Sequence, residues 1–312
     1  MTSKVPPDFR PFFFDREELR AIADAHRDEF RSAEPFPFVV LDDFLPADVA
    51  NRLLAEFPEP EQAKWFRRQG YGFPATPQQD GSNSFRVEGK LECQDPEMLG
   101  PLTRQVLAEL NSGVFLEFLE RLTGVERLLP DPHLGGGGLH SVGLGGRLRV
   151  HADFVWAERI NLDRRLNLLL YLNKGWTAAN GGELELWDAD MTGAVHSIAP
   201  VFNRCVVFAT SSKSFHGHPN PVQGPPGLRR RSLALYYYTN GRPDGEVEDW
   251  HGEATLWQLT PREKSPARTF LRRYTPPFLL DLARYVRREL RGHKLIPPAL
   301  RAKPDRRSSK PG

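Results

Sequence analysis

Apolar residues between positions 139 and 240 fall in short runs or alternate with polar residues, and Gly, Pro and Asn separate them. This pattern predicts β-strands joined by turns. Five segments fit it: RLRVHADF, RRLNLLLYLN, ELELW, RCVVFA and RRSLALYYYT. The glycine-rich stretch 135–146 lacks the strand–GxGxxG–helix context of a nucleotide-binding loop and is predicted to form turns between strands. An antiparallel sandwich or barrel is the expected architecture.

Apolar residues at helical spacing precede these strands. After a predicted strand at 35–45, Pro46 begins a helix whose apolar residues lie one turn apart. Residues 99–123 show the same spacing, with an expected break at 111–113 and an end at Gly124. We expect these N-terminal helices to pack on one sheet. The expected fold class is therefore α+β, mainly β with flanking helices.

The pattern divides the chain into four regions. Residues 1–34 are predicted to be an N-terminal arm with a charged helix that has little apolar face, and 35–245 to be the main domain. A C-terminal helical extension is expected at 246–300, where PPFLLDLARYVRREL combines an apolar face with a basic one. Residues 301–312 are expected to be a disordered basic tail. The polar segment 59–96 is either a solvated loop or a flap over a site.

The composition narrows the classes of function. The 42 Lys and Arg residues nearly balance the 40 Asp and Glu residues, so no nucleic-acid partner is predicted. No uncharged apolar stretch is long enough to span a bilayer, and the N-terminus does not have the pattern of a signal peptide. The two cysteines, Cys93 and Cys205, are too few for a disulfide framework and favour a reducing compartment, so a cytoplasmic location is expected. The sequence predicts no particular oligomeric state.

The segment LRVHADFVW carries the candidate chemistry. His151 and Asp153 are two positions apart, so on a strand their side chains point to the same face, with Arg149 expected beside them. A third ligand would complete a metal site, and SFHGHPNP offers His216 and His218. His216 is favoured because it follows the transition FATSSKSF, where a strand enters the barrel, whereas His218 precedes a proline and is expected in a turn.

Two His and one carboxylate form the facial triad of non-haem Fe(II) oxygenases, although other first-row divalent metals suit the same ligands. The HxD pair by itself occurs often by chance. A hydrogen-bonded core histidine and a turn-capping carboxylate are the structural alternative.

Two further strands present polar side chains on one face. In RRLNLLLYLN an aliphatic face opposes a face with Asn167 and Tyr171, and buried polar groups there need partners or a ligand. In RRSLALYYYT, Arg230 and Ser232 share a face and offer a guanidinium and a hydroxyl to the same carboxylate. A one-residue shift would present Arg231 instead. The alternatives are a core tyrosine bonded to a backbone carbonyl and an arginine run that caps an exposed strand end.

A resemblance to a known family is carried by five segments: HADF, RRLNLLLYLNKGW, NGGELELWD, PVFNRCVVFATSSKSFHGHP and RRSLALYYYT. In this order they resemble the prolyl-4-hydroxylase-type branch of the 2-oxoglutarate/Fe(II) dioxygenases, over residues 139–240. The resemblance implies a double-stranded β-helix, or jelly roll, flanked by helices, and makes 35–245 the dioxygenase domain. It also implies that His151, Asp153 and His216 bind Fe(II), with 2-oxoglutarate and O2 as cosubstrates and ascorbate as an added cofactor.

The same resemblance implies where the cosubstrate binds. Arg230 matches the residue that binds the distal carboxylate of 2-oxoglutarate, and Tyr171 matches its hydroxyl partner. Ser232 and Asn167 are expected in the same site. The interval before Arg230 is longer than is usual in the family, and LHS stands where many relatives have an aromatic residue, which makes His140 a further candidate.

The expected activity is oxidative decarboxylation of 2-oxoglutarate coupled to hydroxylation of a substrate C–H bond. The substrate would be a peptidyl or amino-acid side chain or a small metabolite. Two alternatives stay open: an iron-dependent halogenase on the same scaffold, and a catalytically inactive jelly-roll binding module, for carbohydrates for example. Halogenases of this type have a small residue in place of the carboxylate ligand, so Asp153 argues against the first. Retention of the whole set of two His, Asp, Arg and Tyr argues against the second.

Overall fold

The computed structural model describes residues 12–60, 66–67, 88–243 and 255–257. The predicted helix at 276–290 and the predicted tail at 301–312 lie outside the described residues. None of the described helices is both long enough and apolar enough to cross a membrane.

Antiparallel strands form the centre of the described chain, and they connect into a 13-stranded sheet. In chain order the strands are β1 (Phe38–Leu41), β2 (Phe66–Arg67), β3 (Glu88–Cys93), β4 (Leu129–Pro130), β5 (Gly138–Ala152), β6 (Trp156–Ala157), β7 (Leu162–Tyr171), β8 (Leu184–Trp187), β9 (Ala194–Ile198), β10 (Cys205–Ala209), β11 (His216–His218), β12 (Arg230–Thr239) and β13 (Leu256–Trp257).

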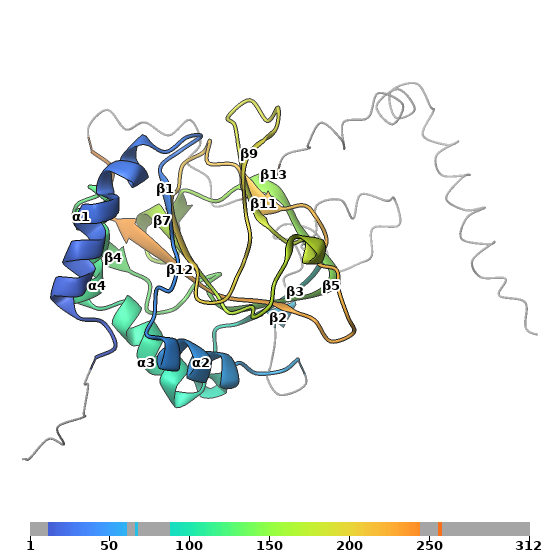
Figure 1. Ribbon diagram of the computed structural model, residues 1–312. Coiled ribbons are helices and arrows are strands. Elements are labelled where there is room, and N and C mark those ends of the chain that lie inside the picture. Colours follow the sequence, from blue (N-terminus) through green and yellow to red (C-terminus); the bar gives the residue numbers. More distant parts are fainter. Residues whose placement is uncertain (1–11, 61–65, 68–87, 244–254, 258–312) are drawn as a thin grey trace, which may run out of the picture. The chain divides into compact units, whose positions relative to one another are not determined.

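Strand β5 carries the sheet from one layer of the fold to the other. Its first half pairs with β12 through residues 138–142, and its second half pairs with β11 through Leu148 and His151. The path of neighbouring strands is β1-β10-β7-β12-β5-β11-β8-β9. The two ends of this path meet, because the ring centroid of Phe38 in β1 lies 4.8 Å from that of His196 in β9. The sheet therefore curls back on itself as the expected jelly roll requires (Figure 1).

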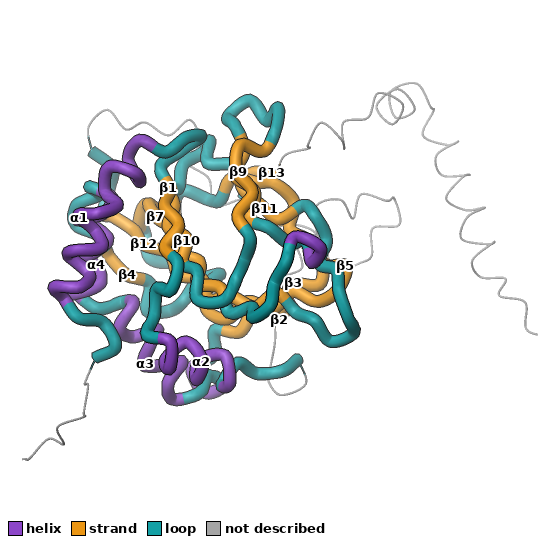
Figure 2. Tube along the Cα trace, in the orientation of Figure 1, coloured by secondary structure: helices purple, strands orange, loops and turns teal. Residues whose placement is uncertain are grey.

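The four α-helices of the described residues lie on one side of the strands (Figure 2). They are α1 (Arg16–Ser32), α2 (Ala47–Ala55), α3 (Pro101–Leu110) and α4 (Gly113–Thr123); two short 3₁₀ helices, η2 (Pro96–Met98) and η3 (Ala178–Asn180), complete the described helices. The predicted break at 111–113 is confirmed, because Ser112 caps α4 by accepting from the backbone N–H of Phe115. The predicted end at Gly124 is also confirmed, since this residue adopts φ 77° in the left-handed region.

The helices cover a row of leucines on β7, as the alternating pattern predicts. Leu166, Leu168 and Leu170 are fully buried and belong to one apolar cluster with residues of all four α-helices. Helix α1 also contributes to this cluster, through Leu19 and Phe30. The helix expected in the N-terminal arm is thus packed into the main core rather than lying free of it.

The glycine-rich stretch 135–146 was predicted to form turns. This prediction is wrong for most of the stretch, because residues 138–146 belong to the long strand β5. Close backbone approach explains the glycine at position 138, because a Cβ atom there would lie 2.4 Å from the carbonyl oxygen of Cys93 in β3. A Cβ on Gly137 would likewise lie 2.5 Å from the carbonyl oxygen of Ala234 in β12. These glycines let β5 pass between two neighbouring strands.

Candidate metal centre

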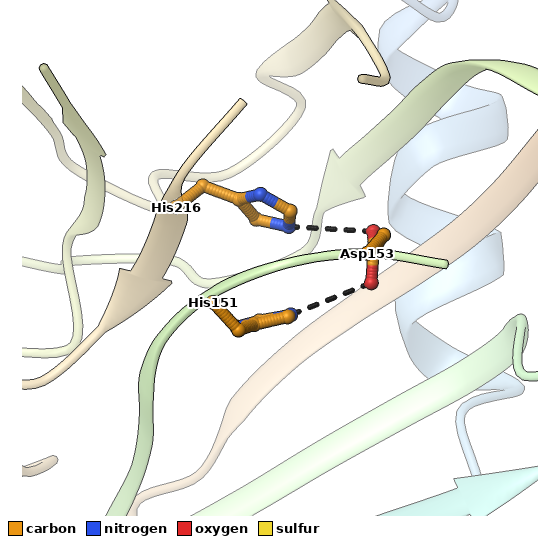
Figure 3. A group of neighbouring side chains, drawn as sticks. All are labelled: His151, Asp153 and His216. Carbon is orange, nitrogen blue, oxygen red and sulfur yellow. Dashed lines mark ion pairs between the residues drawn. The ribbon is translucent and has the colours of Figure 1, made fainter. Parts of the chain in front are cut away.

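The fold brings His151, Asp153 and His216 together. His151 lies in β5 and His216 lies in β11, and Asp153 directly follows β5. In the register of β5 and β11, His151 lies directly opposite His216, and their ring centroids are 4.5 Å apart. Asp153 follows the last residue of β5, and its carboxylate oxygens lie 3.4 Å from Nε2 of His151 and 3.5 Å from Nε2 of His216 (Figure 3). One ligand atom from each of the three lies within 4.8 Å of the others, and all three side chains are buried.

Both imidazoles are oriented by the backbone. Nδ1 of His151 donates to the carbonyl oxygen of Arg149 at 2.8 Å, and Nδ1 of His216 donates to that of Ser214 at 2.9 Å. Because a carbonyl oxygen can only accept, the proton of each neutral ring sits on Nδ1 and the lone pair on Nε2. Burial and the neighbouring His151 lower the pKa of His216 to about 4, so this lone pair is available at neutral pH.

Asp153 is ionised in this setting although it is buried. Burial opposes the charge, but the guanidinium of Arg164 holds the pKa of Asp153 well below its usual value. Nη2 of Arg164 and Nδ2 of Asn167 each donate to Oδ2 of Asp153 at 2.8 Å. The residues present therefore fit a divalent metal: they offer two imidazole nitrogens and one carboxylate, and each of the three side chains is held by hydrogen bonds to the protein.

A buried guanidinium lies in the same cavity. Arg230 begins β12; its Nε donates to the carbonyl oxygen of Gly182 at 2.7 Å and its Nη2 to the hydroxyl of Tyr171 at 3.2 Å. Within the described ranges no carboxylate pairs with Arg230, and its side chain is only 5% exposed. Ser232, directly opposite Tyr171 in the register of β12 and β7, lines the cavity beside it. A carboxylate ligand suits such a guanidinium, because a buried charge needs an opposite charge.

Asn167 lies at the metal end of the cavity. It lines the same cavity as Arg230 and Ser232, with which the sequence grouped it, and its hydrogen bonds are to Asp153 and Arg164. The sequence argument identified the face of β7 on which Asn167 lies, but position along the strand decides which partner a residue meets.

The cavity that these residues line has a volume of ≈ 90 Å³, several times the roughly 10–15 Å³ that one ordered water needs. It is also lined by His140, by His218 and by Leu148. His218 was expected in a turn, but it belongs to β11, and its Nδ1 accepts from the backbone N–H of Leu148 at 3.2 Å. Arg149 was expected on the same face as His151, but Leu148 lies on the cavity face instead. The reason is a bulge between β5 and β11, which shifts the alternation of β5 by one residue.

Arg164 is the residue of this site that the sequence reasoning missed. Alternation along β7 puts Arg165, not Arg164, on the face of Asn167. The register shows a shift: Tyr237 pairs with Leu166, and Tyr238 pairs with Arg164. Arg165 is the extra residue of a β-bulge, which turns Arg164 toward the cavity. The alternation of apolar and polar residues along β7 does not mark such a bulge.

Comparison with known proteins agrees with this geometry. Residues 137–238 match the family model of the 2OG-Fe(II) oxygenase superfamily. The resemblance to the 2-oxoglutarate/Fe(II) oxygenases is confirmed. The matched segment contains all seven residues that the sequence singled out as metal or cosubstrate ligands: Asn167, Tyr171, His151, Asp153, His216, Arg230 and Ser232. The family implies Fe(II), 2-oxoglutarate and O2 as the reacting set.

The chain is also similar to solved structures of oxygenases. The chain is similar to a prolyl hydroxylase from Trichoplax adhaerens in complex with a hypoxia inducible factor peptide fragment, with 15% identity over 71% of this chain and 91% of that one, and a TM-score of 0.51. It is also similar to a prolyl-4-hydroxylase from Pseudomonas putida, with 23% identity, coverage of 72% and 100%, and a TM-score of 0.45. No match was found among curated proteins. The first likeness supports the jelly-roll oxygenase fold.

Proposed function

We propose that this protein is a dioxygenase that couples oxidative decarboxylation of 2-oxoglutarate to hydroxylation of a substrate C–H bond, with Fe(II) as its metal. The observation that carries the proposal is the meeting of His151, Asp153 and His216 in one buried cavity, with ligand atoms within 4.8 Å of one another. Three protein ligands leave the remaining positions of a six-coordinate metal open for cosubstrate and O2.

In this proposal His151 and His216 bind the metal through Nε2, and Asp153 binds it through a carboxylate oxygen. When bound, Fe(II) with 2-oxoglutarate and O2 supplies the oxidising chemistry, which yields succinate and carbon dioxide. The protein residues supply position, charge and the exclusion of water. The backbone carbonyls of Arg149 and Ser214 keep both imidazoles in the tautomer that presents Nε2.

Arg230 binds the distal carboxylate of 2-oxoglutarate in this scheme, and the hydroxyl of Tyr171 supports it. Burial raises the pKa of the Tyr171 phenol, so this hydroxyl keeps its proton and can donate it to a carboxylate oxygen. Leu169 and Phe208 line the same cavity and provide apolar walls for the methylene groups of the cosubstrate. Ser232 adds a second hydroxyl near the guanidinium.

The substrate we propose is a peptidyl or amino-acid side chain or a small metabolite, with ascorbate as an auxiliary reductant and the cytoplasm as location. A halogenase needs the carboxylate position vacant for a halide. Here Asp153 fills that position and is fixed by two hydrogen bonds, so hydroxylation is the better-supported outcome.

Succinate production is the direct test. Purified protein is supplied with 2-oxoglutarate and screened against peptides, free amino acids and glycans, with and without Fe(II). We expect succinate only with Fe(II), and background levels in Asp153→Ala. Asp42→Asn, which alters an aspartate paired with Arg204 on the surface, serves as the control and should keep full turnover. Undiminished succinate release by Asp153→Ala would refute the assigned ligands.

A further inference from the structure

Arg164 has a large, charged side chain that is buried inside the protein. It is 1% exposed, and it points from β7 toward the carboxylate of Asp153. A buried guanidinium is costly unless charge and hydrogen bonds compensate it. Its contacts therefore indicate what it does, and the inference drawn from them rests on the proposed metal site.

The two oxygens of Asp153 have different surroundings. Oδ2 accepts from Nη2 of Arg164 and from Nδ2 of Asn167, both at 2.8 Å. Oδ1 accepts from neither of them, and it lies 3.4 Å from Nε2 of His151. Oδ2 also lies 3.5 Å from Nε2 of His216. Both lone pairs of Oδ2 are nevertheless engaged by the two donors, whereas Oδ1 accepts from neither of them.

Arg164 is itself held rigidly. Its Nε donates to Oδ1 of Asn167 at 2.9 Å, so the two residues that hold Asp153 also hold each other. The guanidinium carbon lies 3.5 Å from the ring centroid of Tyr236 and 4.7 Å from that of Phe154. Stacking on these rings and the bulge at position 165 fix the direction from which the guanidinium reaches the carboxylate.

We propose that Arg164 is a positioning residue for the metal site, and that with Asn167 it makes Asp153 a ligand through Oδ1 alone. A carboxylate bound through one oxygen uses one coordination position instead of two, which keeps room for two oxygens of 2-oxoglutarate and for O2. The same hydrogen bonds orient the carboxylate of Asp153 before the metal arrives. Partners of metal ligands typically change metal affinity by about 10–100-fold when they are removed.

The positioning role of Arg164 is tested by measuring the affinity for a metal ion in the absence of turnover. Mn(II) is titrated into the full-length protein, and the free ion is measured by electron paramagnetic resonance. We expect Arg164→Gln to weaken Mn(II) binding about 10–100-fold. Arg164→Lys, which keeps the charge but loses the fork to Asn167, should recover part of this loss. Asn167→Ala should weaken binding less than Arg164→Gln does.

The neighbouring arginine gives a matched control. Arg165 is also buried, and its Nη1 donates to the hydroxyl of Thr239 at 3.3 Å. Arg165→Gln should lower the unfolding midpoint but leave Mn(II) affinity within about 2-fold of the unaltered protein, since a purely structural arginine has no effect on the ligands. Circular dichroism verifies the fold of each variant.

The outcomes distinguish a failure of the positioning role from a failure of the proposed function. Unaltered Mn(II) affinity in folded Arg164→Gln would overturn the positioning role and leave the proposed function standing. If Arg164→Gln does not fold, Arg164→Lys and Asn167→Ala decide, and wild-type affinity in both would overturn the role. Absence of Mn(II) binding in the unaltered protein, or binding that survives Asp153→Asn, would instead overturn the proposed function together with this role.

Discussion

Arg230 and Arg231 are neighbours in β12, but their guanidinium groups lie on opposite faces of the sheet. Nη2 of Arg230 donates to the hydroxyl of Tyr171 inside the cavity, at 3.2 Å. Nη2 of Arg231 donates to Oε1 of Glu59 at 2.7 Å, and that carboxylate is half exposed. The sequence left open which of the two faces inward, and the register of β12 against β7 answers it.

This arrangement predicts that Arg230→Met weakens binding of 2-oxoglutarate. Loss of a buried guanidinium that pairs with a carboxylate costs about 2 kcal/mol or more, which corresponds to roughly 30-fold in the dissociation constant. Isothermal titration of 2-oxoglutarate into Mn(II)-loaded protein without O2 measures this constant. The affinity for Mn(II) itself should be unchanged, because Arg230 has no hydrogen bond to Asp153, His151 or His216.

Arg231→Met is the matched control for this substitution. Exposed ion pairs contribute only about 0–1 kcal/mol, so this variant should bind 2-oxoglutarate within about 2-fold of the unaltered protein. A large loss in Arg231→Met together with none in Arg230→Met would mean that the inward residue is Arg231.

The two cysteines allow a test of burial that is independent of the metal site. Cys93 and Cys205 have fully buried side chains, and burial raises the pKa of both thiols. A raised pKa lowers the thiolate fraction at every pH below it, and the thiolate is the form that alkylating reagents attack. We therefore expect no modification by iodoacetamide in the folded protein between pH 7 and 9, measured by mass spectrometry.

Unfolding in guanidinium chloride supplies the control, because both thiols should then react completely. Rapid labelling of Cys205 in the folded protein would contradict its place in the core between β7 and β1, where it lies opposite Leu170 and Leu41.

The sequence predicts sheet faces well wherever a strand alternates without interruption. The leucines of β7 lie in the core, and Tyr171 lies on the opposite face, as alternation requires. In β12, Arg230 and Ser232 share the cavity face, and Leu233 and Leu235 share the core face. One-sided burial fixes these faces, because a slip by one residue would move every leucine out of the core.

Irregular backbone limits the same reasoning. Bulges opposite β11 and β12 bring Leu148 and Arg164 to the cavity, where alternation predicted Arg149 and gave Arg164 no role. A bulge depends on the pairing of two strands that are distant in sequence, so a single strand carries little trace of it. The sequence likewise does not predict the short strand β11, because its three residues His216–His218 contain no apolar pattern.

Gly182 and Gly175 provide a matched pair for a test of how the backbone holds Arg230. Both adopt left-handed φ angles, 68° and 66°, so Ala at either position should cost about 1–2 kcal/mol of stability. A Cβ on Gly182 would lie 3.1 Å from Cδ of Arg230 and 3.2 Å from Cγ2 of Val222, whereas one on Gly175 meets nothing within 4 Å. Gly182→Ala should therefore displace Arg230 and raise the dissociation constant of 2-oxoglutarate several-fold in the titration described above, while Gly175→Ala should lower the unfolding midpoint alone. Equal cosubstrate affinity in the two variants would show that the contact with Gly182 does not position the guanidinium, and that Tyr171 suffices to hold it.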